Sequence, residues 1–445
     1  YMKQILSLLL LLCSNALYSQ HASAPILCGN ELFSHLLKTK YPQLQAAFDQ
    51  TFEAAKHTAP AADRSPLNIK VVVHVIWNDP SENLPDSVVE NQIQVLNEDF
   101  NRLNADTANL RPQFYPAAGS ADIHFELAQI VRVETSQLFE IDIFGNNILP
   151  EVKRSSLGGS DAWDTDQYLN LWVCNIQPTT IFGIPVGQIL GFAFPPNNLG
   201  HWPANSGAPS ADDDGVVIDY RLMGRNNPNP LPDPTGGTGN LTVIGRTPTH
   251  EIGHYLGLRH IWGDGGLLGP NDCNQSDGVD DTPHANAQSE FDCNTSKNTC
   301  NKVEPFYGAD MPDLVENYMD YSNEACMNMF TKGQVEIMRN VLMGPRSGLL
   351  ESSNVQVPGH NQTHWIISPN PSNGLFFVDF TSEKAQDFSL QVSNPAGKIL
   401  WAQSANTLSP GSQRLSFDGS QWPAGVYFVT LKTPGGHSVR KLVKN

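Results

Sequence analysis

The strongest constraint on the fold comes from one short segment, residues 247–262, which reads TPTHEIGHYLGLRHIW. His250 and His254 lie four residues apart, so on a helix both imidazoles project from one face and can bind one metal ion. Gly257 can adopt the left-handed conformation that ends a helix, and this turn lets His260 return as a third ligand. The segment therefore predicts a helix, a glycine turn and a metal site of three histidines.

The same residues predict the chemistry of the site. Three neutral imidazoles leave one position open for water, which is typical of a catalytic zinc rather than a closed structural one. Glu251 can take a proton from the attacking water, since zinc lowers the pKa of bound water to about 7. Thr247 is the expected N-cap and Pro248 the expected first helical residue. The alternative, three histidines satisfied within a core, is disfavoured because a buried unpaired His or Glu is costly. We therefore expect water to attack a peptide bond here.

Composition narrows the class of protein. The 445 residues carry 27 Lys and Arg against 45 Asp and Glu, a net charge of -18. This acidic balance repels phosphate backbones and argues against nucleic-acid binding, whereas it suits Ca²⁺. Beyond the N-terminus, no apolar run reaches the roughly 18 to 20 residues needed to span a bilayer. We expect no nucleic-acid partner and no transmembrane segment.

The N-terminus predicts export. Residues 1–20 combine a lysine, an apolar stretch and small polar residues, as a secretory signal peptide does. Residues 21–64 end in a loose stretch rich in Pro and Ala, and they are predicted to form a propeptide that is released by cleavage near Arg64. Export exposes cysteines to oxidising conditions, so paired cysteines are expected to form disulfides.

Two regions with different patterns follow. Residues 65–346 combine β-branched runs with a helical pattern over residues 87–104, which predicts an α/β sheet domain. Residues 347–365 are predicted to be a polar linker. Residues 366–445 contain short alternating strands between turn signals and predict a small all-β sandwich. The strands expected in the first region span residues 69–77, 123–131, 168–176 and 216–220.

Five of the cysteines lie in the sheet domain. Cys273, Cys293, Cys300 and Cys326 cluster in one loop-rich stretch and predict two disulfides, although the sequence alone permits three pairings. Cys174 lies in an apolar run and is expected to be a buried core thiol.

The same loop-rich stretch is acidic. Asp277, Asp280 and Asp281, followed by Thr282, would repel one another unless a cation gathers them, so this loop is a candidate calcium site. The alternative is a solvated acidic loop without an ion.

The motif HEIGHYLGLRH matches the HExxHxxGxxH signature of the metzincin zinc proteases. Residues 317–321, NYMDY, resemble their Met-turn, with Met319 as the apolar floor beneath the zinc. Segments such as VVVHVIW, LNEDFNRLNAD and DDGVVIDYR resemble the pappalysin family, and within it the bacterial ulilysin and mirolysin type. The resemblance spans residues 65–345 and implies an α+β metzincin fold, with a mixed, mostly parallel twisted sheet and an active-site helix.

The resemblance also implies roles for individual residues. His250, His254 and His260 would bind zinc, and Glu251 would be the general base and acid. Tyr321 would lie near the metal, able to swing and stabilise the oxyanion, because a hydroxyl donor aimed at developing negative charge lowers the barrier.

Further features of this type concern latency and structure. The resemblance implies the pairs Cys273–Cys300 and Cys293–Cys326, and it favours calcium in the acidic loop. Cys28 would be a latency switch, since a thiolate can occupy the position of the catalytic water on zinc. The alternative is that Cys28 is an incidental thiol.

One position departs from the pattern. In the members that cut before Arg or Lys, an acidic residue immediately precedes the last disulfide cysteine. Here that position is Ala325, and Glu324 stands one residue earlier. These two residues are expected to belong to the specificity pocket. Because the acidic residue is displaced by one position, the sequence does not decide whether a basic residue is preferred after the cleaved bond.

The tail resembles the C-terminal sorting domain of the type IX secretion system, through SPNPSNG, LQVSNPAGKIL and WPAGVYFVTL. The alternative is a module that binds substrate or glycan.

The sequence thus predicts a zinc endopeptidase of proteins and peptides, made as a latent zymogen and exported by the type IX secretion machinery to the medium or surface of a Gram-negative bacterium. The competing hypothesis is a noncatalytic surface adhesin on a metzincin-like scaffold. The intact Glu251 counts against it, because metal binding alone does not need that residue.

Overall fold

The chain forms two compact units, residues 1–354 and residues 355–445. The signal segment and Cys28 lie outside the described residues. The computed structural model describes residues 26–27, 52–53, 55–56, 65–140, 149–181, 184–193, 211–233, 239–263, 273–289, 291–351, 364–368, 372–382, 386–394, 398–408, 411–433 and 436–444.

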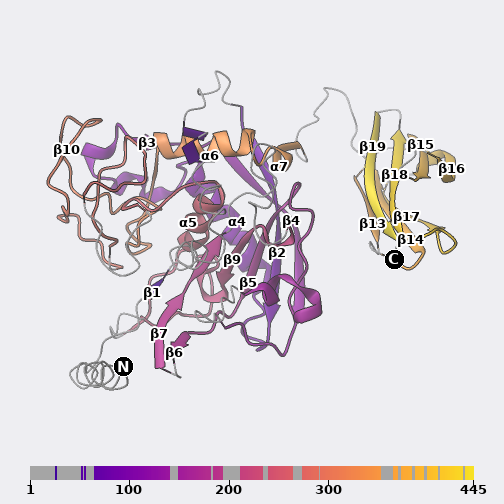
Figure 1. Cartoon of the computed structure of the whole chain (residues 1–445), viewed down its shortest axis with the longest axis horizontal. Helices are drawn as coiled ribbons and strands as arrows, with labels where there is room; N and C mark the ends of the chain where they lie inside the picture. The colour runs from indigo at the N-terminus through magenta and orange to yellow at the C-terminus, as the bar shows by residue number, and fades with distance from the viewer. Residues whose placement is uncertain are drawn as a thin grey trace, which may run out of the picture. The chain divides into compact units, whose positions relative to one another are not determined.

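A five-stranded sheet forms the centre of the first unit (Figure 1). Its order is β4-β2-β5-β9-β8, and only β8 runs antiparallel to its neighbour. Each residue of β5 is buried, as expected of a parallel strand covered on both faces. The predicted mixed, mostly parallel sheet is confirmed. The strands are β2 (Leu67–Trp77), β4 (Ile123–Glu134), β5 (Leu169–Cys174), β8 (Gly191–Ala193) and β9 (Val216–Asp219).

Two helices lie against this sheet, α4 (Asp86–Phe100) and α5 (Arg246–Tyr255) (Figure 1). The apolar positions of α4, such as Val89, Ile93 and Leu96, recur at helical spacing and join the core of the unit. The sheet and α4 together form the support on which α5 rests.

Shorter elements complete the first unit. The helices are α6 (Lys332–Met343) and α7 (Gly348–Glu351), with 3-10 turns at Ala105–Asn109, Pro112–Phe114, Pro150–Lys153, Ser155–Leu157, Ala211–Asp213 and Tyr220–Leu222. The strands are β1 (Ile26–Leu27), β3 (Ala118–Gly119), β6 (Thr179–Ile181), β7 (Ile184–Ile189), β10 (Val303–Glu304), β11 (Ala309–Asp310) and β12 (Phe330–Thr331).

The second unit is all β. One sheet has the order β13-β14-β17 and the other β16-β15-β18-β19, and their inward side chains, such as Phe376, Leu390 and Val429, share one core. The predicted sandwich is confirmed. Its strands are β13 (His364–Ser368), β14 (Leu375–Ser382), β15 (Gln386–Ser393), β16 (Ile399–Leu408), β17 (Gly411–Asp418), β18 (Gly425–Thr433) and β19 (Gly436–Lys444).

The cysteines of the loop-rich stretch are paired. Cys273 is bonded to Cys300 and Cys293 to Cys326, with Cα–Cα distances of 5.6 and 5.8 Å. Cys174 is buried and free, as expected of a core thiol. Within the described ranges, no helix is both long enough and apolar enough to cross a membrane.

A buried histidine stands in the centre of the sheet. On β2, His74 Nδ1 lies 2.8 Å from Ser160 Oγ, and its Nε2 lies 3.0 Å from Asn170 Oδ1. Its ring stacks on Trp172 at 5.2 Å. Burial lowers the pKa of His74 from 6.5 to about 4, so the ring is neutral at pH 7.

This neutral histidine predicts sensitivity to acid. Between pH 6.5 and about 4 the unfolded chain binds a proton at this position that the folded chain does not. The free energy of unfolding therefore decreases as the pH falls from 6.5 to about 4, by on the order of 3 kcal/mol, because protonation of His74 favours the unfolded chain. In denaturant titrations, we expect the free energy of unfolding to fall less between pH 7 and pH 4 in His74→Gln than in the wild type. His124→Gln, on the adjacent strand β4, is the matched control, and an equal loss in His74→Gln would refute the prediction.

Candidate active site

The active-site helix begins one residue before the position expected from the sequence. Gly245 is the N-cap, with φ +86°, and Arg246 starts α5, so the expectation that Thr247 is the N-cap was wrong. The cap comes from a distant residue, Glu324. Its carboxylate accepts hydrogen bonds from the backbone N–H of Ile244 at 2.6 Å and of Thr247 at 2.8 Å, and from the Thr247 hydroxyl at 2.7 Å. A carboxylate here also complements the helix dipole.

The other end of α5 closes as the glycine in the motif predicts. Gly257, with φ +91°, follows the C-cap residue Leu256. The N–H of Gly257 donates to the His254 carbonyl at 2.9 Å, and that of Leu258 donates to the Gly253 carbonyl at 3.0 Å. These two bonds form a Schellman motif, which satisfies the last carbonyls and turns the chain sharply. The turn brings His260 back toward α5.

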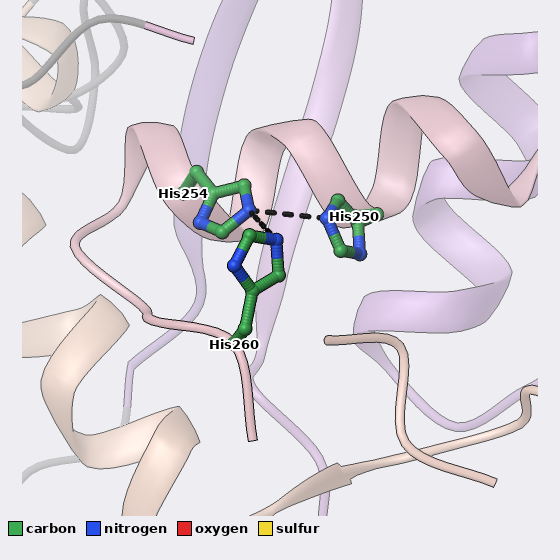
Figure 2. A group of neighbouring side chains, drawn as sticks. All are labelled: His250, His254 and His260. Atoms are coloured by element: carbon green, nitrogen blue, oxygen red, sulfur yellow. Dashed lines mark hydrogen bonds between the residues drawn. The ribbon is translucent and has the colours of Figure 1, made fainter. Parts of the chain in front are cut away.

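The three histidines converge on one point (Figure 2). His254 Nε2 lies 3.0 Å from both His250 Nε2 and His260 Nε2, and all three residues are buried. Tetrahedral zinc with Zn–N distances of about 2.0 to 2.1 Å holds its nitrogen ligands about 3.3 Å apart. The donor set and its spacing therefore fit a zinc ion bound by three imidazoles.

Backbone carbonyls set the tautomers of two ligands. His250 Nδ1–H donates to the Tyr318 carbonyl at 2.7 Å, and His254 Nδ1–H donates to the Leu258 carbonyl at 2.9 Å. Each bond leaves the Nε2 lone pair free for a metal. Burial lowers the pKa of His250 to about 4, and it lowers those of His254 and His260 well below 6.5. The neutral, metal-binding form thus prevails at pH 7.

Met319 packs against the active-site helix at Gly253. The residue is fully buried, and a Cβ placed on Gly253 would lie 2.5 Å from its Sδ atom. The Met319 carbonyl accepts from the Ile261 N–H at 3.4 Å, and its own N–H donates to Asn317 Oδ1 at 2.9 Å. The contact explains why the helix carries glycine between its two histidines.

Sequence reasoning missed one supporting residue, Asp99 on α4. Its carboxylate accepts hydrogen bonds at 2.9 Å from the hydroxyls of Thr249 and Tyr318, and the Arg246 guanidinium lies 3.6 Å away. Burial raises the pKa of Asp99 to about 6 against the opposing effect of Arg246. Asp99 holds Tyr318, whose carbonyl orients His250. A carboxylate on the apolar face of a predicted helix was the available signal.

Glu251 and Tyr321 border the same pocket as His250. Glu251 is buried on α5, and the Tyr321 ring centre lies 5.6 Å from that of His250 and 5.1 Å from that of His260. A carboxylate and a phenol therefore line the pocket that His250 also borders.

The residues predicted for the calcium site and the specificity pocket differ in burial. Asp277, Asp281 and Thr282 are buried in the acidic loop, whereas Asp280 is exposed. Glu324 lines the pocket, but Ala325 is exposed on the surface and does not line it.

Comparison with known proteins identifies the family. A sequence profile described as pregnancy-associated plasma protein-A matches residues 239–343. Mature mirolysin of Tannerella forsythia, solved with a cleaved peptide, is 36% identical with a TM-score of 0.51, and the match covers 65% of this chain and 99% of that chain. The chain belongs to the pappalysin family of metalloproteases.

Other pappalysin relatives agree. Promirolysin of T. forsythia is 34% identical with a TM-score of 0.56, over 73% of this chain and 97% of that chain. An extracellular metalloprotease of Arthroderma otae is 26% identical, over 68% of this chain and 87% of that protein. A second profile, the secretion system C-terminal sorting domain, matches residues 367–445. This pappalysin is therefore an extracellular metalloprotease that is secreted or displayed at the cell surface.

The Gly253–Met319 contact predicts an unusual effect of alanine in this pappalysin helix. In an exposed helix, Gly→Ala stabilises by roughly 0.5 to 1 kcal/mol. Here the added Cβ would meet Met319 Sδ at 2.5 Å, and overpacking typically costs about 1 to 3 kcal/mol. We expect Gly253→Ala to lower the thermal midpoint and weaken zinc binding about 10-fold or more. In a Met319→Ala background the substitution should no longer destabilise, and equal losses in both backgrounds would refute the steric account.

Proposed function

We propose that this chain is a zinc endopeptidase, made as a latent zymogen, in which Glu251 is the general base and Tyr321 stabilises the oxyanion. One observation carries the proposal. Three buried Nε2 atoms converge beside a carboxylate and a phenol that border one pocket. Zinc held by His250, His254 and His260 would polarise the substrate carbonyl and lower the pKa of water to about 7.

Glu251 performs the proton transfers. It follows His250 on α5 and lines the same pocket as His250 and Tyr321, which places it beside the proposed zinc ligands. It takes a proton from the attacking water and then delivers it to the leaving amine, so that one residue acts as base and acid. Removing such a group typically costs 10² to 10⁴ in rate.

Tyr321 acts on the developing negative charge. Its ring packs among Trp262, His250 and His260, which places it beside the three-histidine cluster. A phenolic O–H donated to the oxyanion stabilises the transition state more than the substrate, because the negative charge is larger there.

Contacts of the N-terminal segment support latency. The backbone of β1 runs parallel to β7, with Ile26 opposite Gln188 and Leu27 opposite Ile189. Ile189 immediately precedes Leu190, which lines the pocket. The proposed propeptide therefore passes beside the site, and Cys28, the proposed zinc-blocking thiol, follows Leu27 directly in the sequence.

A second part of the segment is anchored in the catalytic unit. Phe52 is buried beneath the Arg259 guanidinium, whose carbon lies 4.4 Å from the ring centre. Asn340 donates a hydrogen bond to the Ala55 carbonyl at 2.7 Å. Cleavage near Arg64 would release a segment that these contacts otherwise hold over the enzyme. Relatedness to promirolysin supports a precursor form.

We also propose a structural calcium ion at the acidic loop. Among the described side chains, Asp277 Oδ2, Asp281 Oδ1 and Thr282 Oγ1 are buried oxygens without a hydrogen-bond partner. Burial raises the pKa of both aspartates, and a hard cation would gather the carboxylates in their charged form. The sorting domain adds the type IX secretion machinery as the proposed export partner.

The catalytic assignment predicts two graded losses. With denatured casein and zinc-loaded, processed protein, we expect Glu251→Gln to lower kcat by 10² to 10⁴. Tyr321→Phe should lower kcat by about 10² to 10³, with KM nearly unchanged. Zinc content measured on the same samples is the control. A Glu251→Gln protein that binds zinc and keeps wild-type activity would refute the role of Glu251.

The calcium proposal predicts a selective loss. At fixed zinc concentration, added CaCl₂ should raise the thermal midpoint of the wild type by several degrees, because only the folded state binds the ion. Asp277→Asn should abolish this shift, whereas Asp280→Asn, at an exposed position, should retain it. Equal shifts in both variants would exclude Asp277 as a ligand.

A further inference from the structure

A pocket opens directly beside the proposed catalytic residues. His250, Glu251 and Tyr321 form part of its lining, and residues 241–243 and 322–324 form another part. A substrate whose scissile bond lies at Glu251 therefore places a neighbouring side chain in this pocket. The chemistry of the lining then decides which residue can flank the cleaved bond.

Most of the pocket wall is apolar. Among the described residues, no Lys or Arg lines it, and the charged residues of the lining are Glu251, Asp320 and Glu324. An apolar wall favours a side chain that buries apolar surface there. The apolar wall consists of Leu190, Leu222, Leu241, Val243, Phe291 and Met327.

Glu324 is already engaged. Its carboxylate accepts three hydrogen bonds, from Ile244 and Thr247 at the start of α5. A carboxylate offers about four lone-pair positions, and a bidentate guanidinium needs two of them. Bidentate pairing of Glu324 with a substrate Arg would therefore displace at least one of the hydrogen bonds that cap the helix carrying His250.

The other two carboxylates are also unsuited to pairing. Asp320 Oδ1 accepts the Ser289 N–H at 3.0 Å, and Asp320 Oδ2, which has no hydrogen-bond partner within the described part of the chain, is shielded from solvent. A guanidinium cannot reach that oxygen without displacing the wall. Glu251 must exchange protons with water during each cycle, so an ion pair with substrate would block its role.

We propose that this pocket selects a large apolar side chain, such as Leu, Met or Phe, at one position flanking the scissile bond, and disfavours Arg and Lys there. The proposal rests on the proposed peptidase function and names its substrate class. A buried cation without an available carboxylate loses its hydration and gains no partner, whereas an apolar side chain gains contact with the wall.

The proposal can be tested by a substitution that adds a carboxylate to the pocket wall. Processed, zinc-loaded protein and its Leu241→Asp variant cleave a proteome-derived peptide library, and mass spectrometry reads the residues on both sides of each cut. The position at which Leu241→Asp raises Arg and Lys, by at least tenfold, is the position that enters the pocket. Leu241→Asn is the matched control and should not produce this gain. Val243→Asp provides a second variant if thermal unfolding shows that Leu241→Asp is unfolded.

The cleavage profile of the wild type then shows which residue the pocket prefers. Enrichment of Leu, Met or Phe at the responding position supports the proposal. Enrichment of Arg or Lys there in the wild type overturns it and leaves the peptidase function intact, as does the absence of any response to both acidic variants. No cuts by folded, zinc-loaded wild type would instead overturn the peptidase function, and this inference with it.

Discussion

The hydrogen bonds that hold both ends of α5 determine where the three imidazoles lie. Glu324 caps the first turn, and the Gly257 turn satisfies the last carbonyls and returns His260 to the helix. The same turn presents the Leu258 carbonyl that fixes the tautomer of His254. Because ligand nitrogens must converge within a few tenths of an ångström, loss of either end would disperse the metal site before it unfolded the domain.

The support of the site extends well beyond the ligands. Asp99 on α4 holds Tyr318, and Tyr318 in turn orients His250, so the helix that covers the sheet is connected to the metal site by two hydrogen bonds. Met319 fills the space beneath Gly253 and leaves no room for a larger residue. Glu324 links two parts of the site, since its carboxylate caps α5 and the same residue lines the pocket.

Local patterns made much of this architecture predictable. The β-branched run on β2, the fully buried β5 and the glycine at residue 257 have strong local preferences, and each lies close to its expected position. The cap on α5 could not be predicted, because Glu324 lies 77 residues from Thr247. Asp99 and Thr249 are 150 residues apart. Such contacts depend on how the elements pack. The sequence therefore predicted the three histidine ligands but not the hydrogen bonds of Glu324 and Asp99 that support them.

Zinc binding by the three histidines can be tested by anomalous diffraction at the zinc absorption edge, on crystals of the Glu251→Gln protein. We expect one strong peak about 2.0 to 2.1 Å from Nε2 of His250, His254 and His260, with Nδ1 of His250 still bonded to the Tyr318 carbonyl. A zinc-loaded crystal with no peak among these three nitrogens, or with a peak bound by other residues, would contradict it.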